Sequence, residues 1–201
     1  MKISKESASD IRNSLCNVND AFRSYNYIGS NSLFMNNMGG FFRNVLLNSL
    51  RHYIILNLFK LVDKNPKSNS IWNFLKSVKR FDQSKTLEID LDMKLIETDI
   101  HIKNMIRLRH KFYAHRDSGI LNNTTVVQPL LKDDVEEILK IYYNIFHKYY
   151  LNIFNEEFPL HGMCNSKLNT TIDNDLDGFI KTYLLGIKTK YPNRNLLILN
   201  K

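Results

Sequence analysis

The 201-residue chain has few of the residues that build disulfide-linked or linker-rich proteins. It contains two cysteines, four prolines and seven glycines. The two cysteines, Cys16 and Cys164, lie far apart, which excludes a disulfide scaffold. The low proline and glycine content excludes collagen-like structure and long linkers, and a hydrophobic fraction of 43% excludes wholesale disorder. The composition is that of an ordinary globular protein.

Long apolar runs are absent as well. The longest, residues 53–62, is interrupted by Asn57 and Lys60 and is much shorter than the roughly 20 residues that a membrane span needs. The first six residues are mostly polar, and no apolar core of a signal peptide follows them. We therefore expect a soluble protein of the reducing cytoplasm, without a membrane partner.

Positive charge is in excess. The chain has 28 Lys and Arg against 20 Asp and Glu, which gives a formal net charge of +8. Such a charge favours polyanionic partners and makes RNA or DNA a leading partner class. The alternative is a plain helical interaction protein whose basic charge is incidental.

Apolar residues recur at helical spacing in nearly every long segment, which predicts an all-α bundle of long antiparallel helices. The segment 41–63 is apolar around most of its circumference, which places it at the centre of the bundle or in a subunit interface. Residues 159–173 are expected to form a loop, and Asp133 with Glu136 resembles a capping box that starts the penultimate helix. The expected helices are 6–27, 41–63, 70–81, 90–116, 133–158 and 175–189.

The segment 107–117 contains the candidate functional residues. At 100° per residue, Arg109 shares the apolar stripe of Ile102, Met105 and Tyr113. Burying an unpaired guanidinium costs several kcal/mol, so we expect Arg109 to reach a partner, a cleft or a bound anion. His115 lies six positions on, about 240° around a straight helix. The two converge if the helix ends near His115, if the arginine extends across the groove, or if a second subunit brings copies together.

Arg109 is followed directly by the polar residue His110, and five residues in all separate Arg109 from His115. This pattern resembles the signature of the HEPN domain superfamily. The residues 114–117, together with 41–43 and 61–63, are similar to its abortive-infection branch. The resemblance covers about residues 35–155. It implies a single helical domain over residues 1–201, with a HEPN-like core at about 35–158 and a C-terminal appendage at about 159–201.

This resemblance also implies an activity and a site. Catalytic members are metal-independent endoribonucleases, usually homodimers in which both subunits line one cleft. Carried onto this chain, the catalytic residues are Arg109, which holds the scissile phosphate, and His115, the general acid or base, with His110 supporting both. Arg107, Lys111 and Arg116 would contact the RNA backbone. Asp117 and Tyr113 are expected to support them, Asp117 by orienting His115 or Arg116.

Motifs for metals and cofactors are incomplete. His161 and Cys164 lack a second ligand pair. The acidic residues 173, 175 and 177 match the first half of a calcium loop without its closing Glu. We therefore expect no metal and no cofactor.

The resulting hypothesis is a ribonuclease of a bacterial defence or toxin–antitoxin system, with RNA as substrate and an antitoxin protein as a possible partner. The alternative is a non-catalytic HEPN-like module that binds RNA or protein.

Overall fold

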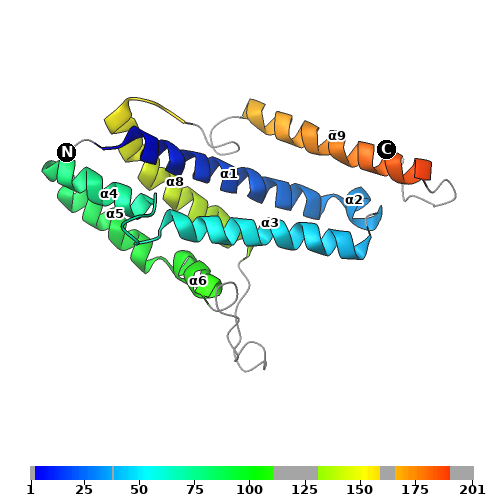
Figure 1. Cartoon of the computed structure of the whole chain (residues 1–201), viewed down its shortest axis with the longest axis horizontal. Coiled ribbons are helices and arrows are strands. Elements are labelled where there is room, and N and C mark those ends of the chain that lie inside the picture. Colours follow the sequence, from blue (N-terminus) through cyan, green and yellow to red (C-terminus); the bar gives the residue numbers. More distant parts are fainter. Residues whose placement is uncertain (1–2, 38, 111–130, 159–165, 191–201) are drawn as a thin grey trace, which may run out of the picture. The chain divides into compact units, whose positions relative to one another are not determined.

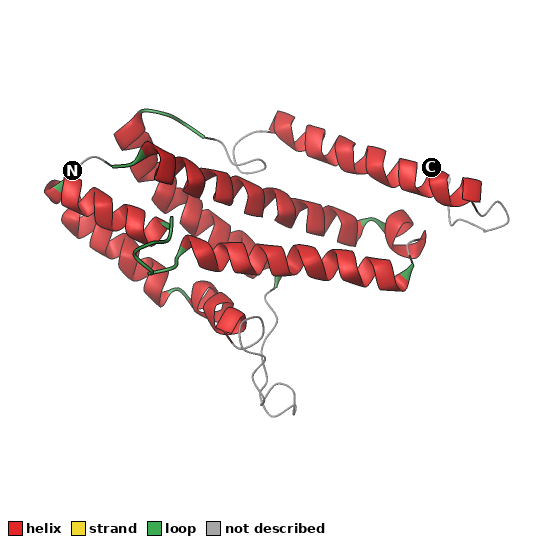
Figure 2. Cartoon of the chain, in the orientation of Figure 1, coloured by secondary structure: helices red, strands yellow, loops and turns green. Residues whose placement is uncertain are grey.

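Every secondary-structure element in the described part of the chain is helical, as Figure 2 shows, so the all-α prediction is confirmed. The computed structural model describes residues 3–37, 39–110, 131–158 and 166–190. Within these ranges lie α1 (Lys5–Ser30), α2 (Ser32–Asn37), α3 (Gly40–Leu61), α4 (Ile71–Phe81), the short 3-10 helix η1 (Gln83–Lys85), α5 (Thr86–Thr98), α6 (Ile100–Leu108), α8 (Lys132–Phe154) and α9 (Ser166–Lys190).

The chain divides into two compact units, which are described separately. The first comprises residues 1–18 and 54–158, and the second comprises residues 19–53 and 159–201. In the first unit, α4 and α5 lie side by side and run in opposite directions, joined by η1 (Figure 1). Helix α8 packs against α4 and α6.

Helix α8 supplies much of the core of the first unit. Its fully buried side chains include three large aromatic residues, Tyr142, Tyr149 and Phe146. The Phe146 ring meets the Phe74 ring of α4 edge-on, with centroids 4.9 Å apart, a favourable geometry for aromatic pairs. Burial raises the pKa of Tyr142 well above its usual 10.0, so its phenol stays neutral. An aromatic core of this kind makes α8 the central support of the first unit.

One carboxylate joins α5 to α8. Asp92 accepts hydrogen bonds from the Lys148 ammonium at 2.6 Å and from the Tyr149 hydroxyl at 2.7 Å. Burial raises the pKa of Tyr149, and the hydrogen bond to Asp92 raises it further. Glu88, one turn earlier on α5, also pairs with Lys148 at 3.0 Å. The single ammonium of Lys148 is thus paired with two carboxylates of α5.

The region predicted as one helix over 90–116 is broken, and this detail of the prediction was wrong. Helix α5 ends at Thr98, whose hydroxyl donates to the Lys94 carbonyl. Asp99 leaves the helical conformation, with φ −57° and ψ 135°, and its side chain accepts from the Ile102 amide at 3.0 Å. An aspartate in this position starts a new helix because it satisfies an otherwise unpaired N–H group. The Arg109 segment therefore belongs to a shorter, separately capped helix.

Other helix boundaries also differ from the sequence prediction. The residue that precedes helix α8 is Leu131, not Asp133. The Asp134 carboxylate caps the start of the helix by accepting a hydrogen bond from the Leu131 amide at 2.7 Å. Asn155, with φ 52°, ends the same helix in the left-handed conformation. Helix α9 starts at Ser166, so the expected loop over 159–173 is wrong from residue 166 onward.

The second unit has a small apolar core of its own. Ile28 of α1 and Ile180 of α9 are buried there. Partly buried residues of three helices surround them: Tyr27, Leu46, Leu47, Leu50, Leu176, Tyr183 and Leu184. Asp177 lies inside α9 and accepts a hydrogen bond from the Tyr27 hydroxyl.

The pairing of His101 with Asp134, which joins α6 to α8, predicts a pH-dependent stability. His101 Nδ1 lies 2.6 Å from Asp134 Oδ1, and this hydrogen bond, with Asp99 nearby, raises the pKa of His101 above 6.5. Folding therefore favours the protonated ring. The resulting stabilisation is complete below pH 6.5 and is lost as the pH rises through the raised pKa.

We expect His101→Gln to lower the free energy of unfolding by ~0.2–1 kcal/mol at acidic pH, because the pair is partly exposed. The loss should shrink as the pH rises through the raised pKa of His101, because the wild-type ring then becomes neutral as well. Urea titrations of both proteins across this range measure the difference. A difference that does not change with pH would show that the charge of His101 contributes nothing.

Candidate nucleic-acid site

Arg109 follows the last residue of α6, on the side of the helix that carries buried residues. Ile102 and Met105 are fully buried, and the Arg109 amide donates to the carbonyls of Met105 and Ile106. Residues 109 and 110 continue the helix as a wider, π-type turn, a feature that often occurs at functional sites. The prediction that Arg109 lies among apolar neighbours agrees with this position.

The Arg109 guanidinium lies over an aromatic ring. Its Cζ is 4.3 Å from the centroid of Phe59, which belongs to α3. A guanidinium at this distance from a ring face is attracted by the negative face of the π system. Arg109 is only half-buried, and in the described ranges of the chain it forms no ion pair with a carboxylate. The contact with Phe59 holds its side chain without neutralising its charge.

His110 contacts both of these residues. Its ring is nearly perpendicular to the Phe59 ring, at 84° with centroids 5.4 Å apart. Its Nδ1 is 3.5 Å from Arg109 Nη1, which can donate to it when Nδ1 carries no proton. The imidazole is otherwise exposed. Arg109, His110 and Phe59, which we call the arginine cluster, thus come together from two helices.

One donor of the arginine cluster has no acceptor among the described residues. Arg109 Nε is buried, and no described residue accepts a hydrogen bond from it. An unsatisfied buried donor costs about 1–3 kcal/mol, more when the group is charged. Arg109 as a whole is half-buried rather than enclosed, and an anionic oxygen is the strongest acceptor for a guanidinium.

Two more cations extend along the outer face of α6. Lys103 and Arg107, one turn apart, are exposed, and neither forms an ion pair with a described residue. Three lysines elsewhere in the first unit, by contrast, are each paired with a carboxylate: Lys64, Lys79 and Lys148. The α6 face therefore presents positive charge that remains available to a polyanion.

Neither Lys103 nor Phe59 is among the site residues predicted from the sequence. Lys103 lies four positions before Arg107, so helical periodicity alone could have placed both on one face. Phe59 lies fifty positions before Arg109 in the sequence, and no local pattern connects the two. The other predicted site residues, Lys111, Tyr113, His115, Arg116 and Asp117, lie outside the described residues.

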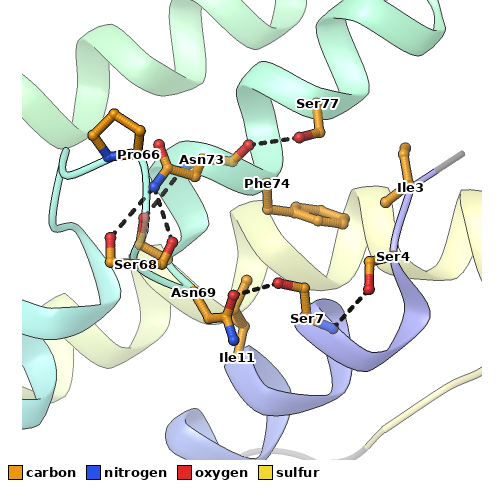
Figure 3. A pocket seen from close by; sticks show the side chains of 11 residues that line it. Ile3, Ser4, Ser7, Ile11, Pro66, Ser68, Asn69, Asn73, Phe74 and Ser77 are labelled. Carbon is orange, nitrogen blue, oxygen red and sulfur yellow. Dashed lines mark hydrogen bonds between the residues drawn. The ribbon is translucent and has the colours of Figure 1, made fainter. Parts of the chain in front are cut away.

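A separate pocket lies elsewhere in the first unit, between the start of α1 and the segment that leads into α4 (Figure 3). It has a volume of about 260 Å³, and serine and asparagine side chains supply its polar lining. Many of their hydrogens are already donated within the protein: Ser7 donates to Asn69, and Asn73 donates to the Ser68 carbonyl. The pocket includes neither Phe59 nor any residue of segment 107–110, so it does not belong to the arginine cluster.

The described residues provide neither a metal site nor a membrane-spanning helix. No three His, Cys, Asp or Glu side chains among them lie close enough together to hold a metal ion. None of the described helices is long and apolar enough to cross a membrane.

Comparison with known proteins identifies a family. The family model HEPN_AbiU2, described as AbiU2, matches residues 5–166. This match includes α6, the arginine cluster and the predicted His115. No curated protein and no solved structure shows significant similarity to the chain. Because the match covers most of the chain and the described fold is helical throughout, the protein belongs to the HEPN AbiU2 family of abortive-infection domains.

Proposed function

We propose that this protein is a metal-independent endoribonuclease of a bacterial defence or toxin–antitoxin system. The observation that carries the proposal is the half-buried Arg109, whose charge no described carboxylate neutralises and whose Nε has no described acceptor. A cation held in this way is matched to a phosphate oxygen. Its position within the segment that resembles the HEPN signature makes RNA the substrate.

The proposed chemistry is an attack of the ribose 2′-hydroxyl on the adjacent phosphorus. His115 removes the proton from the 2′-oxygen or donates one to the departing 5′-oxygen. A new bond forms between the 2′-oxygen and phosphorus while the bond to the 5′-oxygen breaks. The products are a 2′,3′-cyclic phosphate and a 5′-hydroxyl. Arg109 stabilises the charge that develops on the phosphate oxygens.

The remaining site residues support this step. His110 contacts Arg109 and holds its guanidinium from the side. Arg107, Lys111 and Arg116 bind phosphates on either side of the scissile bond, and Lys103 extends the same face of α6. Asp117 orients His115 or Arg116, and Tyr113 supports the segment.

The proposed assembly is a cytoplasmic homodimer in which the 109–115 segments of both chains line one cleft. Several large apolar residues of the first unit are exposed, including Leu87, Leu91 and Phe81. Exposed apolar side chains of this number suit a protein–protein contact. A protein antitoxin is the second partner that we propose.

Chelation of divalent metals tests the reaction class. Purified protein incubated with total RNA in excess EDTA should cut as fast as in magnesium, because histidine and arginine supply the proton transfer and the charge stabilisation. Phosphatase-resistant 3′ ends, which become labile after acid treatment, would identify the cyclic phosphate. Loss of cleavage in EDTA that returns when magnesium is added would contradict the proposal.

The second candidate function is RNA binding without cleavage. Lys103, Arg107 and Arg109 suit that role equally well, since all three bind phosphate rather than transfer protons. RNA that is bound by the wild-type protein at low salt, but never cut with or without metal, would favour this alternative.

A further inference from the structure

We propose that Phe59 is a positioning residue: its ring holds the Arg109 guanidinium in place for the scissile phosphate without neutralising it. The inference rests on the proposed function, because it assigns Arg109 to the phosphate. It adds a residue on α3, far from the HEPN-like segment in the sequence, to the machinery of the site.

The geometry of the Phe59 ring is the first argument. Arg109 Cζ lies 4.3 Å from the ring centroid, and the His110 ring meets the same ring at 84°. One aromatic side chain thus contacts both polar residues of the arginine cluster. Removing it would release both of them at once.

The rigidity of α3 at this point is the second argument. Leu58 and Leu61, on either side of Phe59, are 0% and 1% exposed. Because these neighbours are locked into the core of the first unit, the backbone that carries the ring is fixed. A ring on a fixed backbone limits the rotamers of a long, flexible arginine, so less entropy is lost when a phosphate binds.

The charge balance is the third argument. A carboxylate could also hold an arginine, as Asp92 holds Lys148 elsewhere in this unit. It would, however, occupy the guanidinium donors and cancel the charge that a phosphate must meet. The quadrupole of a phenyl ring attracts the cation from its face and leaves the N–H donors in the guanidinium plane free. Arg109 Nε, for which no acceptor lies among the described residues, agrees with this arrangement.

A series of substitutions separates the charge effect from the shape of the ring. We expect Phe59→Leu to lower kcat/KM for RNA cleavage by ~3- to 30-fold, the range that a cation–π contact supplies. Phe59→Tyr, which keeps the aromatic face, should retain most of the rate. A further series replaces Phe59 with phenylalanines that carry one, two or three fluorines. The ring is kept, but the fluorines withdraw electrons from its face. The rate should then fall in steps with the number of fluorines.

Phe154→Leu is the matched control. Phe154 is also half-buried and contacts an aromatic ring, Tyr150 at 5.0 Å, but it contacts no arginine cluster residue. Its fluorinated forms should leave the cleavage rate unchanged. Circular dichroism and a thermal melt on each protein identify variants that do not fold, and the fluorinated series serves if Phe59→Leu is among them.

Binding of an RNA oligonucleotide with 2′-O-methyl ribose at every position, which cannot be cut by this chemistry, provides a second readout. Its Kd should weaken along the same fluorine series, whether or not the protein is a nuclease. If binding follows the series but ribose RNA is never cut, the ribonuclease function fails and the positioning role stands. If Phe59→Leu weakens binding and cleavage while the fluorinated proteins match wild type, the ring only fills space and the inference is wrong.

Discussion

Replacing His115 with alanine should lower RNA cleavage by ~10²–10⁴-fold, the range that a positioned proton donor or acceptor contributes. The variant should still bind RNA, because the phosphate contacts come from the cations of the α6 segment. Single-turnover cleavage of a labelled RNA in EDTA measures the rate, and a filter-binding titration at low salt measures the affinity. This combination of lost cleavage and retained binding distinguishes a catalytic histidine from a structural one.

The control for this substitution is His52→Ala. His52 is an exposed histidine of α3 that belongs to the second unit, and its loss should leave the cleavage rate within twofold of wild type. Equal cleavage by His115→Ala and wild type would contradict the assignment of His115. The binding function would then replace the proposed reaction.

Sequence reasoning predicted best where local signals and burial agreed. Helix α4 is an example: Ser70, which is fully buried, accepts from the Asn73 amide at the start of the helix, and Trp72 docks on the unit as expected. The apolar spacing that follows Ser70 agrees with the cap, so the predicted range of 70–81 lies within one residue of the observed one.

The prediction of one long helix over 90–116 was wrong for a physical reason. Apolar residues continue at helical spacing through the break, so periodicity alone indicates no boundary. Asp99 interrupts the helix by capping the next one. An aspartate in the interior of an apolar pattern can face solvent or cap a new helix, and only the conformation of the backbone decides between them.

The candidate site was predictable in part. A cation on an apolar stripe identified Arg109, and the residue directly after it, His110, indeed contacts it. The sequence predicted a partner, a cleft or a bound anion for Arg109, without indicating that the contact would be an aromatic face. Contacts of this kind depend on how α3 and α6 pack, and no local sequence pattern indicates that packing.

Replacing Arg109 with alanine should lower cleavage by ~10²–10³-fold, since one well-placed donor to a developing negative charge contributes this much. Lysine at the same position keeps the charge but loses the planar fork of donors, so Arg109→Lys should recover only part of the rate. Arg109→Ala should also weaken RNA binding and reduce its salt dependence, because one phosphate contact is lost. The matched control is Arg12→Ala. Arg12 is also a half-buried arginine, but it donates a hydrogen bond to the Tyr150 hydroxyl.

Combining Arg109→Ala with His115→Ala tests whether the two residues act on one chemical step. If they do, the double variant should lose less activity than the product of the two single losses, because each single substitution already disables the shared transition state. Independent roles, such as remote RNA binding by Arg109, would give losses that multiply. Single-turnover rates for all four proteins, measured with protein in saturating excess over RNA, separate the cases, because saturation removes the effect of weaker binding. Multiplicative losses would move Arg109 out of the reaction centre and assign it to the binding face with Arg107 and Lys103.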